Sequence, residues 1–300
     1  MDKLKNRVKR MLGPRNYYTI QDIYHDLKLK KRCEDLYNKV SGNRLLKDSH
    51  SGERCFILGN GPSLKDLDLR MLQDEFTFTV NYFPLLENCL DLRSKAHVMI
   101  DGAFFGLREE MKGSGPLISE NYRRLEKMGC PCFVPADAYP FLSHEAYDIE
   151  FRYVRIGKNI LDGIVSDVDL TKDIYTGTNV IQYVIQIAIY MGFREIYLLG
   201  CESTNILALL NTALGKDTGQ VHAYAKEKDD SDNTNAQIVD HWKMSKIIYD
   251  QYLLFAGFDF WTDYCSGKGI SLINCTPSSL ITGMPRAQID EVLAGENRHV

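Results

Sequence analysis

The fold of this chain is decided by one stretch, Cys55-Phe56-Ile57-Leu58-Gly59-Asn60-Gly61-Pro62-Ser63-Leu64. A short apolar run that ends in turn-forming residues is typical of a buried parallel strand. Gly59 and Gly61 allow a sharp turn and a close backbone approach to a ligand, because neither has a Cβ. Ser63, after Pro62, predicts the start of a helix. A strand, a tight loop and a helix N-terminus predict an anion site, because N–H groups and the helix dipole point to one place.

This glycine pattern is not specific by itself. It lacks the third glycine of the dinucleotide-binding fingerprint, and no Gly-Lys-Ser/Thr follows it as in a Walker loop. An ordinary strand-to-helix turn explains the pattern equally well. The function therefore has to be argued from the rest of the chain.

Composition places the chain among ordinary globular proteins. Its 300 residues, 44% of them hydrophobic and 25% charged, can form one large α/β domain with an extension. Several of the 8 cysteines lie inside apolar runs, which is typical of reduced core cysteines. We find no secretory signal and no run of about 18 apolar residues. We therefore expect a cytoplasmic protein, and the net charge of −4 gives no reason to expect a nucleic-acid partner.

Charge is distributed unevenly along the chain. Residues 1–50 carry a net charge of +7, whereas the remaining 250 carry −11. Leu4, Val8, Met11 and Leu12 share one face of a predicted helix with basic residues around it. Residues 1–12 could rest on the anionic inner face of a membrane, as a peripheral contact. The alternative is a solvated helix packed on the body of the protein or on a second subunit of a homo-oligomer.

Strands and helices alternate along the rest of the chain. After the strand at 55–58, we expect strands at 76–80, 96–100, 132–135, 195–200, 258–261 and 271–274. Helices are expected within 16–47, at 180–191 and at 242–256, with Gly192 and Gly257 ending the last two. Residues 136–175 show no clear period and are predicted to be irregular or mobile. Residues 205–240 are predicted to form a surface loop or lid.

This alternation predicts an α/β fold with a doubly wound, mostly parallel, Rossmann-like sheet. We expect a basic helical extension over residues 1–50. Residues 51–300 would form one Rossmann-like domain, with 205–240 as its lid.

Polar residues follow several of the predicted strands. In open α/β sheets, ligands bind outside the carboxyl ends of the strands. Asn60, Asn81, Asp101 and Glu202 come at such ends, and Thr176-Gly177-Thr178 precedes the helix at 180–191. Asparagine suits sugar hydroxyls and nucleobases, because its amide both donates and accepts. Each residue alone is more often a turn or cap residue.

Two histidines, His222 and His241, are candidates for a general base, because an imidazole can take a proton from a hydroxyl near neutral pH. The structural alternative for His241 is a residue on a helix surface. Asp229, Asp230 and Asp232 lack the pattern of a calcium loop, so no metal site is predicted.

Several motifs in order resemble the bacterial sialyltransferases of glycosyltransferase family 42. They also resemble the related group similar to archaeal 6-hydroxymethylpterin diphosphokinase, which includes many proteins of surface-polysaccharide clusters. The motifs are the stretch 56–64, Asn81 after a strand, the turn at 176–178 and the run 192–200. His222-Ala223-Tyr224 is similar to a His-Phe-Tyr signature of that group, and 274–280 to its Asn-Ala-Thr-Pro segment.

The resemblance implies a metal-independent transfer of sialic acid, or a related acidic sugar, from a nucleotide donor such as a CMP-sugar to a glycan or lipid-linked glycan. It implies a histidine as general base and no other cofactor. The implied catalytic residues are His241 and His222. The implied donor-binding residues are Gly59, Asn60, Gly61, Ser63, Asn81, Asp101, Gly177, Thr178, Glu202 and Tyr224.

Two positions depart from the sialyltransferase pattern. The arginine before the Thr-Ser-Gly turn has no counterpart, Lys172 being the nearest base, and Thr204 replaces one phosphate-binding tyrosine. Two alternatives stay open. One is a pyrophosphokinase that uses ATP on a pterin-like alcohol, with Mg²⁺ held by Asp101 and Glu202. The other is a non-catalytic subunit of a polysaccharide-assembly complex.

Overall fold

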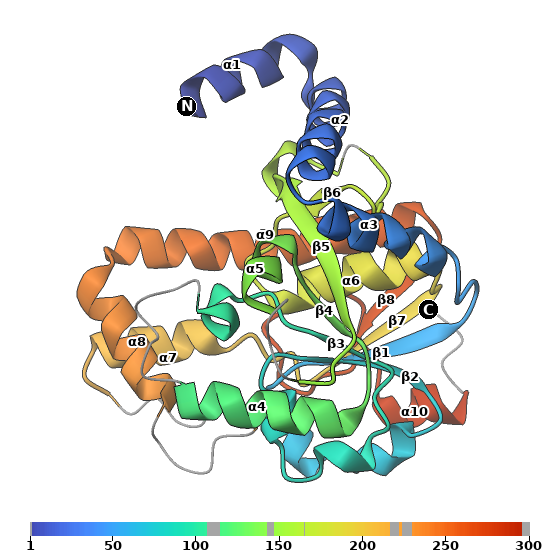
Figure 1. Cartoon of the computed structure of the whole chain (residues 1–300). Coiled ribbons are helices and arrows are strands. Elements are labelled where there is room, and N and C mark those ends of the chain that lie inside the picture. Colours follow the sequence, from blue (N-terminus) through green and yellow to red (C-terminus); the bar gives the residue numbers. More distant parts are fainter. Residues whose placement is uncertain are drawn as a thin grey trace.

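One sheet of eight parallel strands forms the centre of the protein in our computed structural model (Figure 1). The structure describes residues 2–106, 115–142, 147–164, 166–216, 222–223 and 230–295. The strands are β1 Arg54–Leu58, β2 Phe76–Val80, β3 Ala96–Val98, β4 Cys132–Pro135, β5 Phe151–Lys158, β6 Asp173–Tyr175, β7 Glu195–Leu199 and β8 Ser271–Asn274. They lie in the order β6-β5-β4-β3-β2-β1-β7-β8, and every neighbouring pair is parallel. The predicted doubly wound α/β class is confirmed.

Helices cover both faces of this sheet (Figure 1). They are α1 Asp2–Leu12, α2 Pro14–Arg32, α3 Glu34–Gly42, α4 Gly115–Met128, α5 Tyr139–Leu142, α6 Val180–Met191, α7 Asn205–Ala213, α8 Asp230–His241, α9 Met244–Gly267 and α10 Ile289–Ala294. Alternate side chains of β1 enter different cores. Cys55 and Ile57 pack with residues of α6 and α9, whereas Phe56 and Leu58 pack on the opposite face with α10. This burial of both faces explains why the strands are continuously apolar.

The direction in which successive strands are added to the sheet reverses between β1 and β7, which makes this place a topological switch point. From β1 the strands are added outward to β6, and the chain then crosses back to place β7 on the other side of β1. Loops that leave neighbouring strands in opposite directions open a crevice at their carboxyl ends. The ligand site of such a fold is expected there.

The predicted strand at 258–261 is wrong, because these residues belong to α9. Gly257 does not end this helix, which continues to Gly267. A Cβ on Gly257 would lie 2.5 Å from the amide group of Gln182 on α6, so the glycine serves close helix packing. A glycine at a helix contact and a glycine at a helix end have the same sequence signal.

Two other segments are more regular than predicted. The segment 136–175 contains β5 and the edge strand β6, and the ion pairs of β5 with α2 replace the apolar pattern of a buried strand. The segment 205–240 contains α7 and α8 rather than only a loop. Its predicted role as a lid stays a prediction, and residues 217–221 and 224–229 lie outside the described chain. Among the helices described, none is long and apolar enough to cross a lipid bilayer.

Candidate functional site

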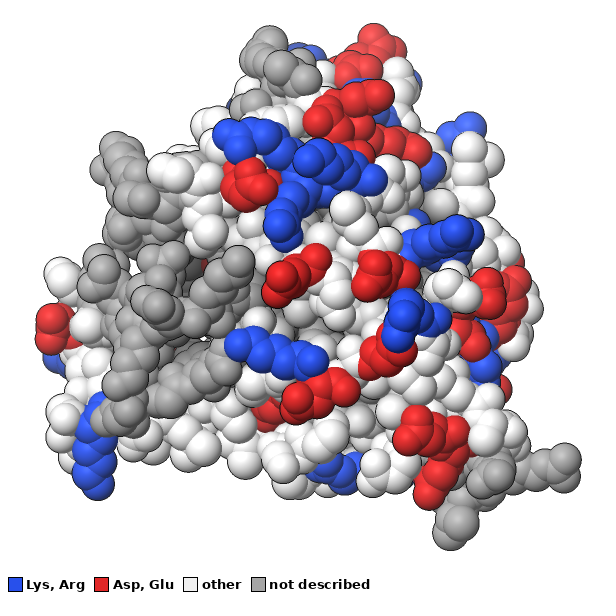
Figure 2. Space-filling model, turned by 90° about the horizontal axis from the view of Figure 1, so that it is seen from below, with Lys and Arg blue, Asp and Glu red and all other residues white. Residues whose placement is uncertain are grey.

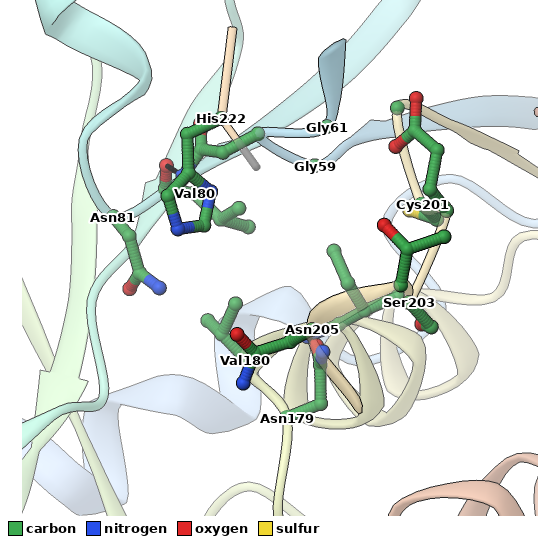
Figure 3. A pocket seen from close by; sticks show the side chains of 15 residues that line it. Gly59, Gly61, Val80, Asn81, Asn179, Val180, Cys201, Ser203, Asn205 and His222 are labelled. Carbon is green, nitrogen blue, oxygen red and sulfur yellow. Dashed lines mark hydrogen bonds between the residues drawn. The ribbon is translucent and has the colours of Figure 1, made fainter. Parts of the chain in front are cut away.

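A pocket of about 150 Å³ lies at the switch point, where β1, β2 and β7 end and where α6 and α7 begin (Figure 3). Figure 3 shows His222 and Asn81 on one side of this pocket, with Ser203 across it and Asn179 and Asn205 below. The lining groups come from five separate stretches of the chain. They include the predicted site residues Gly59, Asn60, Gly61, Asn81, Glu202 and His222.

Glu202 is the one acidic residue among the described residues that line the pocket. Its side chain is buried, with 6% of the residue exposed. Its Oε1 accepts a hydrogen bond from the backbone N–H of Ser63 at 2.8 Å. Its Oε2 is also buried and has no hydrogen-bond partner among the described residues. One carboxylate oxygen is therefore fixed by the protein, and the other is left for a donor in the pocket.

Two N–H groups of the glycine loop, where the sequence predicted an anion, are already occupied by backbone carbonyl groups. The Gly59 N–H donates to Leu199 O at 2.8 Å, and the Gly61 N–H donates to Gly200 O at 2.9 Å. The helix predicted at Ser63 is a short 3₁₀ turn, Pro62–Asp66, which has too few residues for a strong dipole. The carboxylate of Glu202 takes the position at Ser63 where an anion was expected.

Both glycines are required by the close approach of two loops. A Cβ on Gly59 would lie 2.2 Å from Gly200 O. A Cβ on Gly61 would lie 1.3 Å from Glu202 Oε2. The missing side chains let the end of β1 pack directly against the end of β7, which brings Glu202 to the pocket.

Two asparagines bring further acceptors to the pocket. The amide nitrogen of Asn60 donates to Val80 O at 3.1 Å, which fixes the orientation of its amide. The Oδ1 atoms of Asn60 and Asn81 are buried and have no hydrogen-bond partner in the described chain. Asn81 has a positive φ of 49°, a conformation that asparagine tolerates better than most residues.

The backbone of Asn81 is held in that conformation from behind. Its carbonyl oxygen accepts hydrogen bonds from His97 Nε2 and from the amide nitrogen of Asn121, both at 3.1 Å. Burial lowers the pKa of His97 to about 3, so this imidazole is neutral. A carbonyl only accepts, so Nε2 carries the proton, and Nδ1 accepts from the Thr79 hydroxyl at 2.8 Å.

The helices α6 and α7 begin at the pocket. Asn179 is the N-cap of α6, and its side chain accepts from the Ile181 N–H at 2.8 Å. Thr204 is at the N-cap position of α7, where no side-chain cap hydrogen bond is formed. The positive ends of both helix dipoles therefore face one small space that is already lined by hydroxyl and amide groups. Such a combination favours an anion between the two helix ends.

His222 lies over the glycine loop (Figure 3). The N–H of the next residue, Ala223, donates to Asn60 O at 2.8 Å, which attaches this short segment to the loop. Burial lowers the pKa of His222 below the ordinary value of histidine. A neutral imidazole at the pocket can accept a proton but does not supply a positive charge.

The other predicted residues lie elsewhere. Asp101 accepts from the Ala103 N–H at 3.0 Å and caps a 3₁₀ turn. Gly177 exchanges two hydrogen bonds of 2.9 Å with the Tyr183 hydroxyl. Thr178 is exposed, one residue before the cap of α6. None of these three is among the residues that line the pocket.

His241 is exposed at the end of α8, where it lines a shallow pocket with Trp242 and Lys246. Tyr224 lies outside the described residues. Over the part of the chain that the structure describes, no three His, Cys, Asp or Glu side chains converge as a metal site. The roles assigned to these residues by resemblance stay predictions.

Sequence reasoning missed the contribution of Asn179, Ser203 and Asn205, which line the pocket. The signal for Asn205 is present, because Thr204-Asn205 precedes the apolar run Ile206-Leu207-Ala208, as at a helix start. Ser203 has a positive φ of 55°, and nothing in the local sequence predicts that conformation.

The fold and the pocket define a doubly wound α/β protein with a pocket at the switch point of its sheet. No family model matches the chain, and no curated protein matches it. A similar solved structure is that of the sialyltransferase CstII from Campylobacter jejuni in complex with a substrate analogue, cytidine-5'-monophosphate. The two chains are 16% identical with a TM-score of 0.38, over 79% of this chain and 85% of that one. The likeness is too distant to bear on activity.

Proposed function

We propose that this protein is a glycosyltransferase that binds the nucleotide of a sugar donor in the pocket at the switch point. One observation carries the proposal. Three buried oxygens, Asn60 Oδ1, Asn81 Oδ1 and Glu202 Oε2, belong to residues that line the same pocket and have no partner among the described residues. Buried acceptors are costly unless a donor satisfies them. Ribose hydroxyls and a base amino group are such donors, and a carboxylate suits a ribose diol.

The phosphate of the donor would lie between the N-termini of α6 and α7. No Lys or Arg is present among the described residues that line the pocket. Negative charge there would be stabilised by helix dipoles and by the hydroxyl and amide donors of Ser203, Thr204 and Asn205. Fixed dipoles of this kind stabilise the charge that develops on a departing phosphate.

His222 is our choice for the general base, because it lines this pocket and its pKa is lowered by burial. In the proposed reaction, an acceptor hydroxyl gives its proton to the imidazole, and the hydroxyl oxygen forms a bond to the anomeric carbon. The bond from that carbon to the phosphate oxygen breaks, and the nucleotide leaves with the electron pair. We further propose, on the sequence resemblance alone, a CMP-linked acidic sugar, a glycan acceptor and inversion at the anomeric carbon.

The test is calorimetric and thermal-shift titration with CMP, UDP, GDP, dTDP and ATP, each with and without Mg²⁺. A ligand at 100 times its Kd stabilises a protein by about 2.7 kcal/mol, which a thermal shift detects. We expect a response to a pyrimidine nucleotide that does not need Mg²⁺. A response to ATP only, and only with Mg²⁺, would contradict the proposal and support the pyrophosphokinase. No response to any nucleotide would support the non-catalytic subunit.

The variant Glu202→Gln tests the observation that carries the proposal. Glutamine keeps the shape and can still accept from the Ser63 N–H, but it places an NH₂ donor where Oε2 stood. Losing one hydrogen bond to a charged group corresponds to about 1.5–3 kcal/mol, so we expect at least roughly tenfold weaker nucleotide binding. Glu120→Gln, on α4 and away from the residues that line the pocket, is the matched control. Equal affinities of the two variants would contradict the role of Glu202.

A further inference from the structure

The face of α2 that packs against the protein body is mostly polar. Near the end of the helix Leu29 packs on the apolar core, but five inward residues hydrogen-bond or ion-pair with β5, β6 or the short turn after β5. These five residues are Tyr18, Gln21, Asp22, His25 and Asp26. The spacing of three and four places them on one side of the helix. A helix on the surface of a globular protein normally packs the other way, with its apolar face inward.

Buried cations fix this orientation of α2. Arg155 and Lys158 on β5 are 8% and 3% exposed. Arg155 lies 2.7 Å from Asp26 Oδ1, and Lys158 lies 3.1 Å from Asp22 Oδ2. If α2 turned about its axis to bury its apolar side, both cations would lose a counter-ion inside the protein. That loss is strongly unfavourable, so the apolar side of α2 stays outward.

The outward side of α2 carries a continuous apolar stripe. Ile20, Ile23, Tyr24 and Leu27 are 54%, 56%, 58% and 67% exposed. Their spacing of i, i+3, i+4 and i+7 is that of one helix face. No described part of the chain covers this stripe, although its residues are of the kind usually buried in a core.

The neighbouring helix α1 adds a second apolar stripe. Leu4, Val8 and Met11 are 68%, 38% and 81% exposed. Figure 1 shows α1 projecting from the body of the protein beyond the start of α2. An ion pair attaches this helix to the turn after β5, since Lys9 Nζ lies 2.7 Å from Asp162 Oδ2. This ion pair leaves the apolar stripe of α1 exposed.

The exposed charges around the two stripes have one sign. The acidic side chains Asp22 and Asp26 face inward and are paired. All the exposed charged side chains that the structure describes on these two helices are basic: Lys5, Arg7, Arg10, Arg15, Lys28, Lys30, Lys31 and Arg32. In contrast, acidic and basic side chains intermingle over the face seen in Figure 2, which views the molecule from the opposite end.

We propose that α1 and α2 form a docking surface for the anionic surface of a lipid bilayer. Exposed apolar stripes flanked by basic residues match such a surface, because the apolar side chains enter the interface while lysine and arginine meet the lipid phosphates. A second copy of the chain is a poorer occupant, since pairing two such surfaces brings like charges together. The inference is independent of the function proposed for the pocket.

The test is co-sedimentation of the full chain with vesicles of equimolar phosphatidylglycerol and phosphatidylcholine, and with vesicles of phosphatidylcholine alone. We expect binding to the anionic vesicles only, and weaker binding when salt is raised, because ions screen the attraction. The variant Ile20→Gln/Ile23→Gln/Leu27→Gln should lower the partition coefficient roughly 100-fold, because three apolar side chains no longer enter the interface. Lys5→Gln/Arg7→Gln/Arg10→Gln should weaken the preference for anionic lipid, because three of the eight exposed basic side chains are lost.

The matched control is Ile248→Gln/Tyr252→Gln, which removes exposed apolar side chains from α9 instead. It should bind vesicles as the original chain does. Because the stripe of α2 is already exposed to water, all variants should fold, and circular dichroism checks this. Sedimentation velocity without lipid tests whether a second copy of the chain covers the surface instead. A dimer that the α2 variant converts to monomer, or equal vesicle binding by the α2 and α9 variants, would overturn the proposal.

Discussion

The backbone N–H of Ser63 donates to the carboxylate of Glu202 at 2.8 Å, across 139 positions of sequence. This bond joins the loop after β1 to the loop after β7 on the two sides of the switch point. The carboxylate of Glu202 is thus the anion at the start of the 3₁₀ turn, where the sequence alone indicates an anionic ligand. The other oxygen of Glu202, Oε2, consequently has no hydrogen-bond partner among the described residues.

Replacing Gly61 by alanine should weaken nucleotide binding without unfolding the protein. The added Cβ would lie 1.3 Å from Glu202 Oε2, so the carboxylate must move away from Ser63 and from the pocket. We expect at least roughly tenfold weaker binding and a loss of about 1–3 kcal/mol in the free energy of unfolding. Calorimetry and urea unfolding measure the two effects.

Gly42→Ala is the matched control for that substitution. A Cβ there meets no atom within 4 Å, and the backbone is already helical with φ of −61°. The free energy of unfolding should stay constant or rise by about 0.4–1 kcal/mol. Unchanged nucleotide affinity in Gly61→Ala would show that the position of Glu202 does not matter for binding.

His222→Gln should lower turnover far more than nucleotide affinity. A general base contributes about 10²–10⁴-fold to the rate, whereas the binding groups of the pocket are left in place. Burial lowers the pKa of His222, so the imidazole loses its proton at a lower pH than an ordinary histidine does. The acid limb of the kcat/KM profile should therefore lie below pH 6.5, about the unperturbed value.

The same substitution at His241 decides between the two histidines. Both variants should be assayed for sugar transfer with the donor that binds best. A large loss of kcat in His241→Gln, with little change in His222→Gln, would reverse our choice of base. If the acid limb of the kcat/KM profile is unchanged in His222→Gln, the assignment of His222 as the general base is also contradicted.

His97 should make the protein lose stability in acid. Its pKa is about 3 in the folded protein because it is fully buried, whereas an unfolded histidine titrates near its ordinary value of 6.5. Between these values the unfolded chain binds a proton that the folded chain does not. The free energy of unfolding should fall by about 1.4 kcal/mol for each unit that pH decreases through this window.

Urea unfolding of the original chain and of His97→Gln from pH 7.5 to pH 4 measures that contribution. Glutamine cannot titrate, so below about pH 6.5 the free energy of unfolding of the variant should fall less steeply with decreasing pH. Above about pH 6.5 the curves of the two proteins should run parallel. Curves that run parallel over the whole range would mean that His97 is protonated in the folded protein.

Gly257→Ala should destabilise the contact of α6 with α9. Alanine favours a helix interior over glycine by about 1 kcal/mol. Here, however, its Cβ would lie 2.5 Å from the Gln182 amide, which donates to Leu254 O at 2.8 Å. Overpacking costs about 1–3 kcal/mol, so we expect a net loss. Gly267→Ala, near which no atom lies within 4 Å, should be neutral, and a more stable Gly257→Ala would refute the packing role.

Much of the sheet could be predicted from the sequence, because its strands are short apolar runs that end in turn residues. The runs at Phe76–Val80, Cys132–Pro135 and Ser271–Asn274 form strands as expected. Strand β5 was missed, because Arg155 and Lys158 interrupt its apolar pattern, and their counter-ions Asp22, Asp26 and Asp173 come from distant α2 and from β6. Gly257 was wrongly predicted to end a helix, because the sequence does not distinguish a glycine at a helix contact from a glycine that caps a helix.

The sequence by itself determined the α/β class and the polar residues at the strand ends, since both follow from local patterns of apolar and turn-forming side chains. Only the tertiary structure decided how these residues meet. The approach of Gly61 to Glu202, the convergence of α6 and α7, and the outward apolar face of α2 all depend on contacts between distant parts of the chain. Local propensity does not encode such contacts, because burial and pairing are properties of the packed chain.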